Sequence, residues 1–199
     1  MKKRYILLFI VSVFLISLYP TVANAAEETD VTYRFKDENL KQAIIQIIQE
    51  VTGQENKTNI TIEDINTITA ENLPSAKQLN LAGKGITDLT GLELFAGKNI
   101  EWIYLDWNQI QDISVLSRFT TLTKLSLSEN AITDITPLKQ LTNLTNLTIS
   151  NNQITTLDAL SSLTKLQYIY ADNNQITSVE PLTQLTRVTR SFFSRKSNN

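Results

Sequence analysis

The chain has 199 residues, with 18 Lys and Arg against 20 Asp and Glu, and it contains neither Cys nor His. It therefore lacks the usual ligands of zinc, haem and iron–sulfur clusters, and the side chains of Cys–His and Ser–His–Asp catalysis. A net charge of −2 argues against non-specific nucleic-acid binding, and an apolar content of 42% excludes wholesale disorder.

The segment 1–25 has the three-part plan of a secretory signal peptide. Lys2, Lys3 and Arg4 precede a mostly apolar run, 5–18, and the small-residue site Ala23-Asn24-Ala25 follows. The alternative is a membrane anchor, which needs about 20 apolar residues, so we expect cleavage after Ala25. The exported chain would then begin at Ala26, and the loss of three basic side chains would leave it more acidic than the whole.

A small α-helical cap is predicted for residues 26–76. Asp37 is placed to begin a helix and Gly53 to end it. Thr61 and Asp64 have the spacing of a capping box that opens a second short helix. The apolar residues of the first helix recur at helical spacing: Leu40, Ala43, Ile44, Ile47, Ile48 and Val51. One face of this helix is therefore expected to pack on the segment that follows.

Residues 77–188 follow a 22-residue period. Its clearest mark is the series Asn108, Asn130, Asn152 and Asn174. Around each Asn, apolar residues recur at fixed positions, which in one repeat are Leu122, Leu125, Leu127, Ile132, Ile135, Leu138 and Leu141. The full repeats span 100–121, 122–143, 144–165 and 166–187, and a partial repeat before them has Lys84 at the Asn position. This is the leucine-rich repeat pattern, in which stacked units share one core.

The repeat pattern predicts an α/β solenoid. The x-Leu-x-Leu-x part of each repeat alternates, so we expect a short strand with Leu inward and a parallel, concave sheet across the repeats. The buried Asn amide can bond to backbone groups that turn away from the sheet. Because a repeat this short leaves little room for an α-helix on the return path, 3-10 or irregular turns are expected on the convex side.

The residues that flank the inward pair of each strand are expected to point out of the concave side, and we call this set the concave face. Strand by strand, it contains Gln78, Asn80, Ala82; Trp102, Tyr104, Asp106; Lys124, Ser126, Ser128; Asn146, Thr148, Ser150; Tyr168, Tyr170 and Asp172. Exposed aromatic residues on a rigid surface are typical of binding hot spots. We therefore predict partner binding through Trp102, Tyr104, Asp106, Trp107, Lys124, Ser126, Asn146, Thr148, Tyr168, Tyr170 and Asp172. The alternative is that the aromatic side chains pack on one another and protect the sheet.

Three aspartates, Asp88, Asp112 and Asp134, recur on the return turns. A calcium ladder would need several oxygen atoms around each ion, and one Asp per turn does not supply them. We therefore predict that these side chains serve the turns themselves.

The predicted signal peptide, the small helical cap and the 22-residue repeats, which read NQITTLDALSSLTKLQ at 152–167, together resemble the internalin family of Gram-positive bacteria. The motif ITDLTGLELF at 86–95, which joins cap to repeats, resembles the family too, and the resemblance covers about residues 35–188. It implies a secreted or surface protein whose concave face binds other proteins, often host receptors, in adhesion or invasion.

The repeat pattern is lost after residue 188. An Asn is expected at 196, where the chain has Lys196, and an apolar residue at 191, where it has Ser191. We interpret residues 189–199 as an irregular tail, without the immunoglobulin-like cap or wall anchor that internalins usually carry. Two explanations stay open: the gene is truncated or frameshifted within the repeats, or a short natural tail tucks Phe192 and Phe193 over the open end of the solenoid.

Together these inferences predict a secreted or surface binding module that is not an enzyme and needs no cofactor or metal ion. The expected partner is a protein, and the resemblance implies a host cell-surface receptor. We expect a monomer, with no nucleic-acid partner and no stable membrane insertion after signal cleavage. The alternatives are a carbohydrate or cell-wall scaffold, in which sugars stack on the aromatic rings, and an inactive truncated product.

Overall fold

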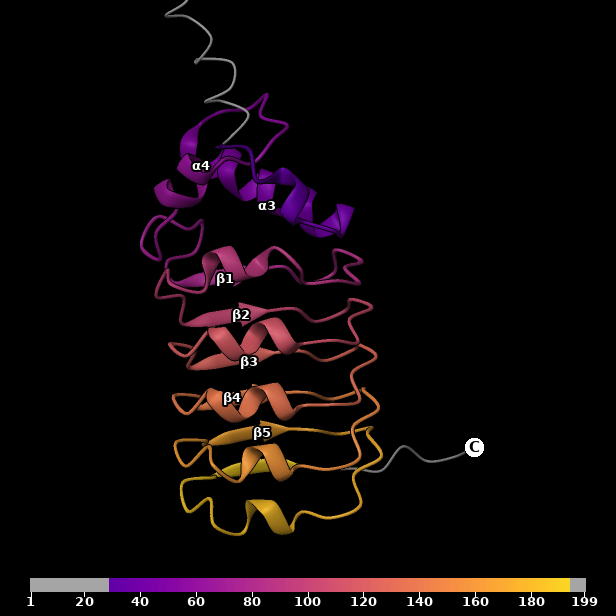
Figure 1. The fold of residues 1–199 in the computed structure, drawn as a ribbon. Helices are drawn as coiled ribbons and strands as arrows, with labels where there is room; N and C mark the ends of the chain where they lie inside the picture. Colours follow the sequence, from indigo (N-terminus) through magenta and orange to yellow (C-terminus); the bar gives the residue numbers. More distant parts are fainter. Residues whose placement is uncertain (1–28, 194–199) are drawn as a thin grey trace, which may run out of the picture.

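The computed structural model describes residues 29–193, in which six parallel strands form one sheet in chain order (Figure 1). The signal-peptide prediction for residues 1–25 lies outside these residues. The strands are β1 (Gln78–Asn80), β2 (Trp102–Tyr104), β3 (Lys124–Ser126), β4 (Asn146–Thr148), β5 (Tyr168–Tyr170) and β6 (Arg190–Phe192). From β2 onward the paired residues are one sequence repeat apart, so the register of the sheet follows the repeat.

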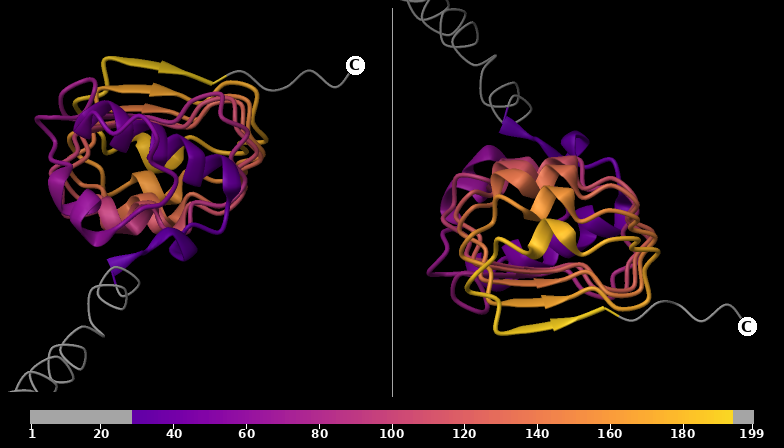
Figure 2. Two further views of the ribbon diagram at one scale, coloured as in Figure 1. Left: turned by 90° about the horizontal axis from the view of Figure 1, so that it is seen from above. Right: turned by 90° about the horizontal axis from the view of Figure 1, so that it is seen from below.

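Short 3-10 helices form the side of the solenoid opposite the sheet (Figure 2). Pro137 and Pro181 lie in the first turns of two of them, where a missing backbone N–H costs no hydrogen bond. The helices are η2 (Leu92–Phe95), η3 (Ser114–Arg118), η4 (Thr136–Gln140), η5 (Asp158–Leu160) and η6 (Glu180–Leu182). The predicted α/β leucine-rich repeat solenoid, with a parallel sheet and a 3-10 convex side, is confirmed.

The apolar positions of the repeat meet in one continuous core between the sheet and the 3-10 helices. The central residue of each of the strands β1 to β5 is buried and its two neighbours are more exposed, as alternation along a strand requires. Phe95 and Phe119 occupy the last apolar position of their repeats and are fully buried. The repeats therefore share one core, which continues from each repeat into the next.

The asparagine series forms a ladder of hydrogen bonds along the core. The side chain of Asn152 is buried, and its Nδ2 donates to the carbonyl oxygens of Leu127 (2.9 Å), Ile149 (3.1 Å) and Ser150 (3.2 Å). Its Oδ1 accepts from the backbone N–H of Ile132 at 3.0 Å. Since Leu127 and Ile132 belong to the preceding repeat, the amide joins two repeats while it closes its own turn. The same pattern recurs at Asn108, Asn130 and Asn174.

The N-terminal cap consists of the 3-10 helix η1 (Thr32–Arg34) and the helices α3 (Glu38–Thr52) and α4 (Ile62–Thr67). Helix α3 lies across the end of the repeat stack, as the view from above in Figure 2 shows. It begins at Asp37, whose side chain accepts from the N–H of Leu40, and it ends at Gly53, which has a φ of 71°. Thr61 and Asp64 form the expected capping box at the start of α4.

Asp37 also joins the cap to the first repeat. Its Oδ2 accepts from the Thr87 hydroxyl (2.6 Å) and from the backbone N–H groups of Thr87 (2.8 Å) and Asp88 (3.3 Å), while its Oδ1 serves Leu40. Burial alone would raise the pKa of this carboxyl, but these hydrogen bonds outweigh it and the pKa lies below its ordinary value of 3.8. The ionised side chain therefore stabilises the docked cap.

A close contact between Phe35 and Gly91 completes the junction. Gly91 has a φ of 103°, and a Cβ atom at this position would lie 2.6 Å from the Phe35 ring and 3.0 Å from the Arg34 carbonyl oxygen. Both the backbone conformation and the space require glycine here. Beside it, Arg34 pairs with Glu93 at 3.1 Å.

An irregular tail was expected for residues 189–199, but the first part of this segment continues the sheet. Residues 190–192 form strand β6, because the backbone groups of Thr189 and Arg190 continue the pairing through the Gln167 carbonyl although Ser191 replaces the inward Leu. Phe193 packs partly into the core, whereas Phe192 is 48% exposed and does not cover the end of the solenoid. Within residues 29–193 we find no helix with the length and apolar character needed to cross a membrane.

Replacement of Asn152 with Ala is expected to lower the free energy of unfolding by about 3 kcal/mol, because buried carbonyl groups lose their donor. Urea unfolding followed by circular dichroism measures this change. Gln153→Ala, at the exposed neighbouring position, should change the free energy by less than about 0.5 kcal/mol. Equal midpoints for the two variants would contradict the role assigned to the ladder.

Replacement of Asp37 with Asn should lower the free energy of unfolding by about 2 kcal/mol at pH 7, because an amide cannot accept all of the four hydrogen bonds. Since the folded pKa lies below the unfolded value of 3.8, the contribution of the wild-type carboxylate is present above that pH and is lost as the pH falls through the folded pKa. The two unfolding curves should therefore converge as the pH falls through the folded pKa. Asp112→Asn, in an exposed turn, should track wild type throughout, and a constant gap between wild type and Asp37→Asn would refute the assignment.

Candidate partner-binding face

The concave face lies on one flank of the solenoid, where the outward residues of the six strands are aligned row by row. Successive strands pair in register, so the outward residues of each strand stand beside those of the next. The face is therefore fixed by backbone hydrogen bonds before any partner binds. Its side chains are mostly half-buried, because each leans on its neighbours in the adjacent strands.

Trp102 is partly covered by Lys124. The Lys124 Nζ lies 3.7 Å from the centroid of the Trp102 ring, which is a cation–π contact between β2 and β3. Tyr104 stands two residues further along β2 and is half-buried. At the N-terminal side of the face, these residues form a packed aromatic and cationic group.

Asp106 has an internal role. It is 9% exposed, and its Oδ1 accepts from the Ser126 hydroxyl (2.6 Å) and the Ser128 N–H (2.9 Å). Both partners lie in the next repeat, so the carboxylate joins two repeats at the end of their strands. Asp106 was predicted to contact a partner, but its carboxylate is already engaged in hydrogen bonds within the chain. These bonds join two repeats, and the spacing of residues in the sequence does not reveal them.

Trp107 is the most exposed of the predicted contact residues. Its side chain is 67% exposed, and its backbone has a φ of 54°. This left-handed conformation recurs just before each ladder Asn, because the N–H at this position donates to the next repeat, here to the Ser128 carbonyl at 3.0 Å. The equivalent residues are Gly83, Glu129, Asn151 and Asn173. A Trp in this conformation costs about 1–2 kcal/mol relative to Gly or Asn, in addition to its exposed indole.

A second aromatic group lies at the C-terminal end of the face. Tyr170 stacks on Phe192 with ring centroids 5.1 Å apart and planes inclined by 9°. Tyr168 stands beside Arg190 in the paired strands β5 and β6. Phe192 was not among the predicted contact residues, although its position one repeat period after Tyr170 would have placed it on the face. The predicted contact Asp172 is half-buried at the end of the same row.

Small polar side chains fill the middle of the face. Ser126 is committed to Asp106, and the Asn146 Oδ1 accepts from the Thr145 hydroxyl at 2.8 Å. Thr148 lies between Ser126 and Tyr170 in the same row of the sheet. The concave face thus has two aromatic ends and a polar centre.

The recurring aspartates act within the return turns, as predicted. Asp88, Asp112 and Asp134 each accept through Oδ1 from the N–H two residues ahead. In the next repeat Thr156 takes this role, which explains why Asp158 falls out of the series. Hydrogen bonds from the Thr136 hydroxyl and N–H lower the pKa of Asp134. Among residues 29–193 no three His, Cys, Asp or Glu side chains converge as metal ligands would.

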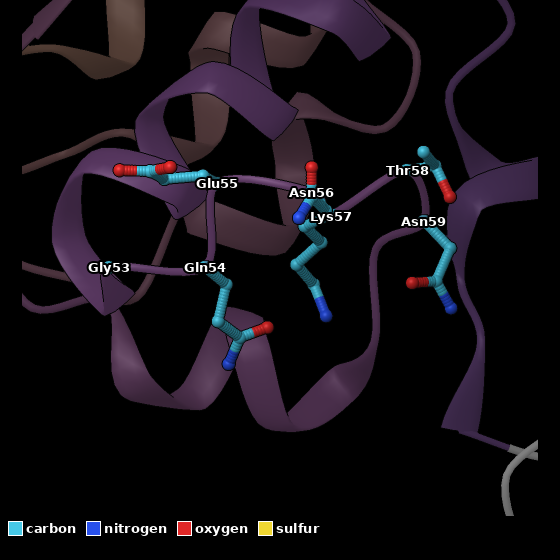
Figure 3. Close-up of a pocket in the computed structure, with 7 residues that line it drawn as sticks. All are labelled: Gly53, Gln54, Glu55, Asn56, Lys57, Thr58 and Asn59. Atoms are coloured by element: carbon cyan, nitrogen blue, oxygen red, sulfur yellow. The ribbon is translucent and has the colours of Figure 1, made fainter.

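The hollow shown in Figure 3 is lined by the loop 53–59 of the cap. Its volume is about 550 Å³, and its lining is polar. Lys57 is part of this lining, but its Nζ pairs with the buried Asp64 carboxylate at 2.9 Å and so stabilises the cap. The hollow offers neither an apolar wall nor an unpaired charge from Lys57, and it is a weaker candidate than the concave face.

Known proteins that resemble the chain share its repeats. The family model described as leucine-rich repeats (2 copies) matches residues 142–184. An internalin (InlF) from Listeria monocytogenes is similar in structure, with a TM-score of 0.60 and 26% identity over 81% of this chain and 52% of the internalin. A leucine-rich repeat protein from Leptospira interrogans has a TM-score of 0.56 and 26% identity over 68% of this chain and 34% of its own. No curated protein matches in sequence.

The chain is a leucine-rich repeat solenoid that is similar in structure to an internalin. It spans about half the length of the Listeria internalin and about a third of the Leptospira protein. Leucine-rich repeat proteins are in general binding modules for other proteins, and this solenoid has the regular sheet surface that such binding uses.

Replacement of Trp107 with Asn should raise the free energy of unfolding by about 1 kcal/mol, because Asn adopts the left-handed conformation at lower cost. Thermal or urea unfolding measures this gain. The reverse exchange in a later repeat, Asn151→Trp, should lower the free energy by a similar amount. A less stable Trp107→Asn variant would show that the indole makes stabilising contacts and would contradict the strain argument.

Proposed function

We propose that this chain is a non-enzymatic binding module that holds a protein partner on its concave face. The observation that carries the proposal is Trp107, which stands at the edge of this face. It is 67% exposed, and its backbone conformation costs stability. A residue that lowers both solubility and stability brings no advantage to the free chain. Its benefit comes when a partner covers it.

The two aromatic ends of the concave face support binding over a broad surface. Trp102 and Tyr104 stand at one end, and Tyr168, Tyr170 and Phe192 at the other, with small polar side chains between them. Such a pattern of aromatic anchors around adaptable polar positions is typical of protein interfaces. Because the strands are already paired, little backbone entropy is lost on association.

The same geometry gives less support to a carbohydrate scaffold. A sugar stacks on an open ring face, but among the rings on the strands Lys124 covers one face of Trp102, and Tyr170 and Phe192 each cover one face of the other. Trp107, at the edge, is the open ring. These contacts reduce the ring area that is open to a pyranose, whereas protein side chains can also contact the ring edges.

The finer parts of the proposal concern location and partner. The pattern of residues 1–25 supports export, and the internalin resemblance supports a role at the host surface in adhesion or invasion. We propose a host cell-surface protein as the partner and a monomeric binding module. The acidic excess of the chain favours a partner with complementary basic groups.

The double variant Tyr168→Ala, Tyr170→Ala tests the proposal. Binding of the chain to an array of purified host surface proteins is measured by surface plasmon resonance. The double variant should weaken binding to any partner found by at least about tenfold, as loss of interface anchors does. Lys139→Ala, on an exposed 3-10 helix of the convex side, is the matched control and should bind like wild type. Trp107→Asn, at the opposite end of the face, is measured beside it, and unchanged binding by both the double variant and Trp107→Asn would exclude the concave face.

A further inference from the structure

Trp107 and Glu129 occupy the same position in neighbouring repeats. Their φ angles are 54° and 58°, and their backbone N–H groups donate to Ser128 and Ser150 in the same manner. Paired strands lie about 4.8 Å apart, so the indole and the carboxylate leave the backbone side by side. Both side chains are exposed at the edge of the concave face where the strands end.

The Glu129 carboxylate makes no hydrogen bond and no ion pair with another residue of the range 29–193. Lys124, the cation of the concave face that lies in the same repeat as Glu129, is already in contact with Trp102. Asp106, the residue before Trp107, accepts hydrogen bonds from Ser126 and Ser128. Glu129 is therefore an exposed anionic group beside an exposed indole, and it makes no ion pair with a cation of residues 29–193.

The chain itself shows how a cation meets an indole on this sheet. Lys124 approaches Trp102 face-on across one strand spacing, at 3.7 Å from the ring centroid. No ring or cation of the described residues contacts Trp107 in this way. An incoming cation over Trp107 would gain the ring attraction and a charge-assisted hydrogen bond to Glu129 together.

We infer that Trp107 and Glu129 form a receptor for one cationic side chain of the partner, with arginine preferred over lysine. Arginine fits because its planar guanidinium can stack on the indole while its N–H groups reach the carboxylate. The inference rests on the proposed protein-binding function and deepens it, because it assigns a chemical preference to one edge of the concave face. It also gives Trp107 a specific use: the strained backbone holds the indole out of the sheet beside the acid.

Selection from a phage-displayed library of random peptides tests this receptor without a known partner. The purified chain is immobilised in parallel with three variants: Trp107→Asn, Glu129→Gln and Glu63→Gln. The last removes an exposed carboxylate of α4 and so matches the charge change away from the face. Recovered peptides are sequenced, and the dissociation constants of the strongest are measured by fluorescence polarisation.

Peptides recovered by wild type and by Glu63→Gln, but not by Trp107→Asn, should carry a shared Arg or Lys. Their affinity should fall at least about tenfold in Trp107→Asn and several-fold in Glu129→Gln, and replacement of the shared Arg by its neutral isostere citrulline should have the effect of Glu129→Gln. The inference is overturned if Trp107-dependent peptides lack a cation, if Glu129→Gln binds like Glu63→Gln, or if no peptide depends on Trp107.

The outcome is separable from that of the proposed function. The peptide selection measures the contribution of Trp107 and Glu129 to binding. The array experiment with the double variant measures the contribution of Tyr168 and Tyr170, at the other end of the face. A protein partner that is lost with the tyrosines, together with no cation dependence at Trp107, would keep the binding face and remove the arginine receptor.

Discussion

The hydrogen bonds of the asparagine ladder are the constraint on which the rest of the structure depends. Each buried amide satisfies backbone groups that would otherwise lie unpaired where the chain turns away from the sheet. This turn also fixes the residue just before the Asn in a left-handed conformation, so that its N–H points to the next repeat. The exposed positions of Trp107 and Glu129 thus follow from a buried interaction one residue away.

Much of this architecture could be predicted from the sequence, because a 22-residue period leaves few ways to bury its apolar positions. The strands, the ladder, the capping residues Asp37 and Thr61, and the turn aspartates all follow from local spacing. The details of the face do not. That Asp106 bonds to Ser126, and that Lys124 covers Trp102, depends on contacts between residues of different repeats. Strand β6 was missed because backbone pairing persists after the side-chain pattern fails.

The junction of cap and repeats shows how one end of a solenoid is closed with specificity. Apolar burial alone would let α3 slide over the first repeat, since hydrophobic contact is non-directional. The buried Asp37 carboxylate sets the position through its bonds to Thr87 and Asp88, and the Phe35 ring over Gly91 sets the distance. A charged capping residue therefore begins the helix and places it on the stack.

The direction of the ladder has a consequence for how the chain folds. Every ladder amide reaches backwards, to a carbonyl and an N–H of the repeat before its own, and the first repeat rests on the cap. A polypeptide emerges from its site of synthesis N-terminus first. Each new repeat of this chain consequently meets a neighbour that is already in place, and its Asn supplies the hydrogen bonds that complete that neighbour's turn.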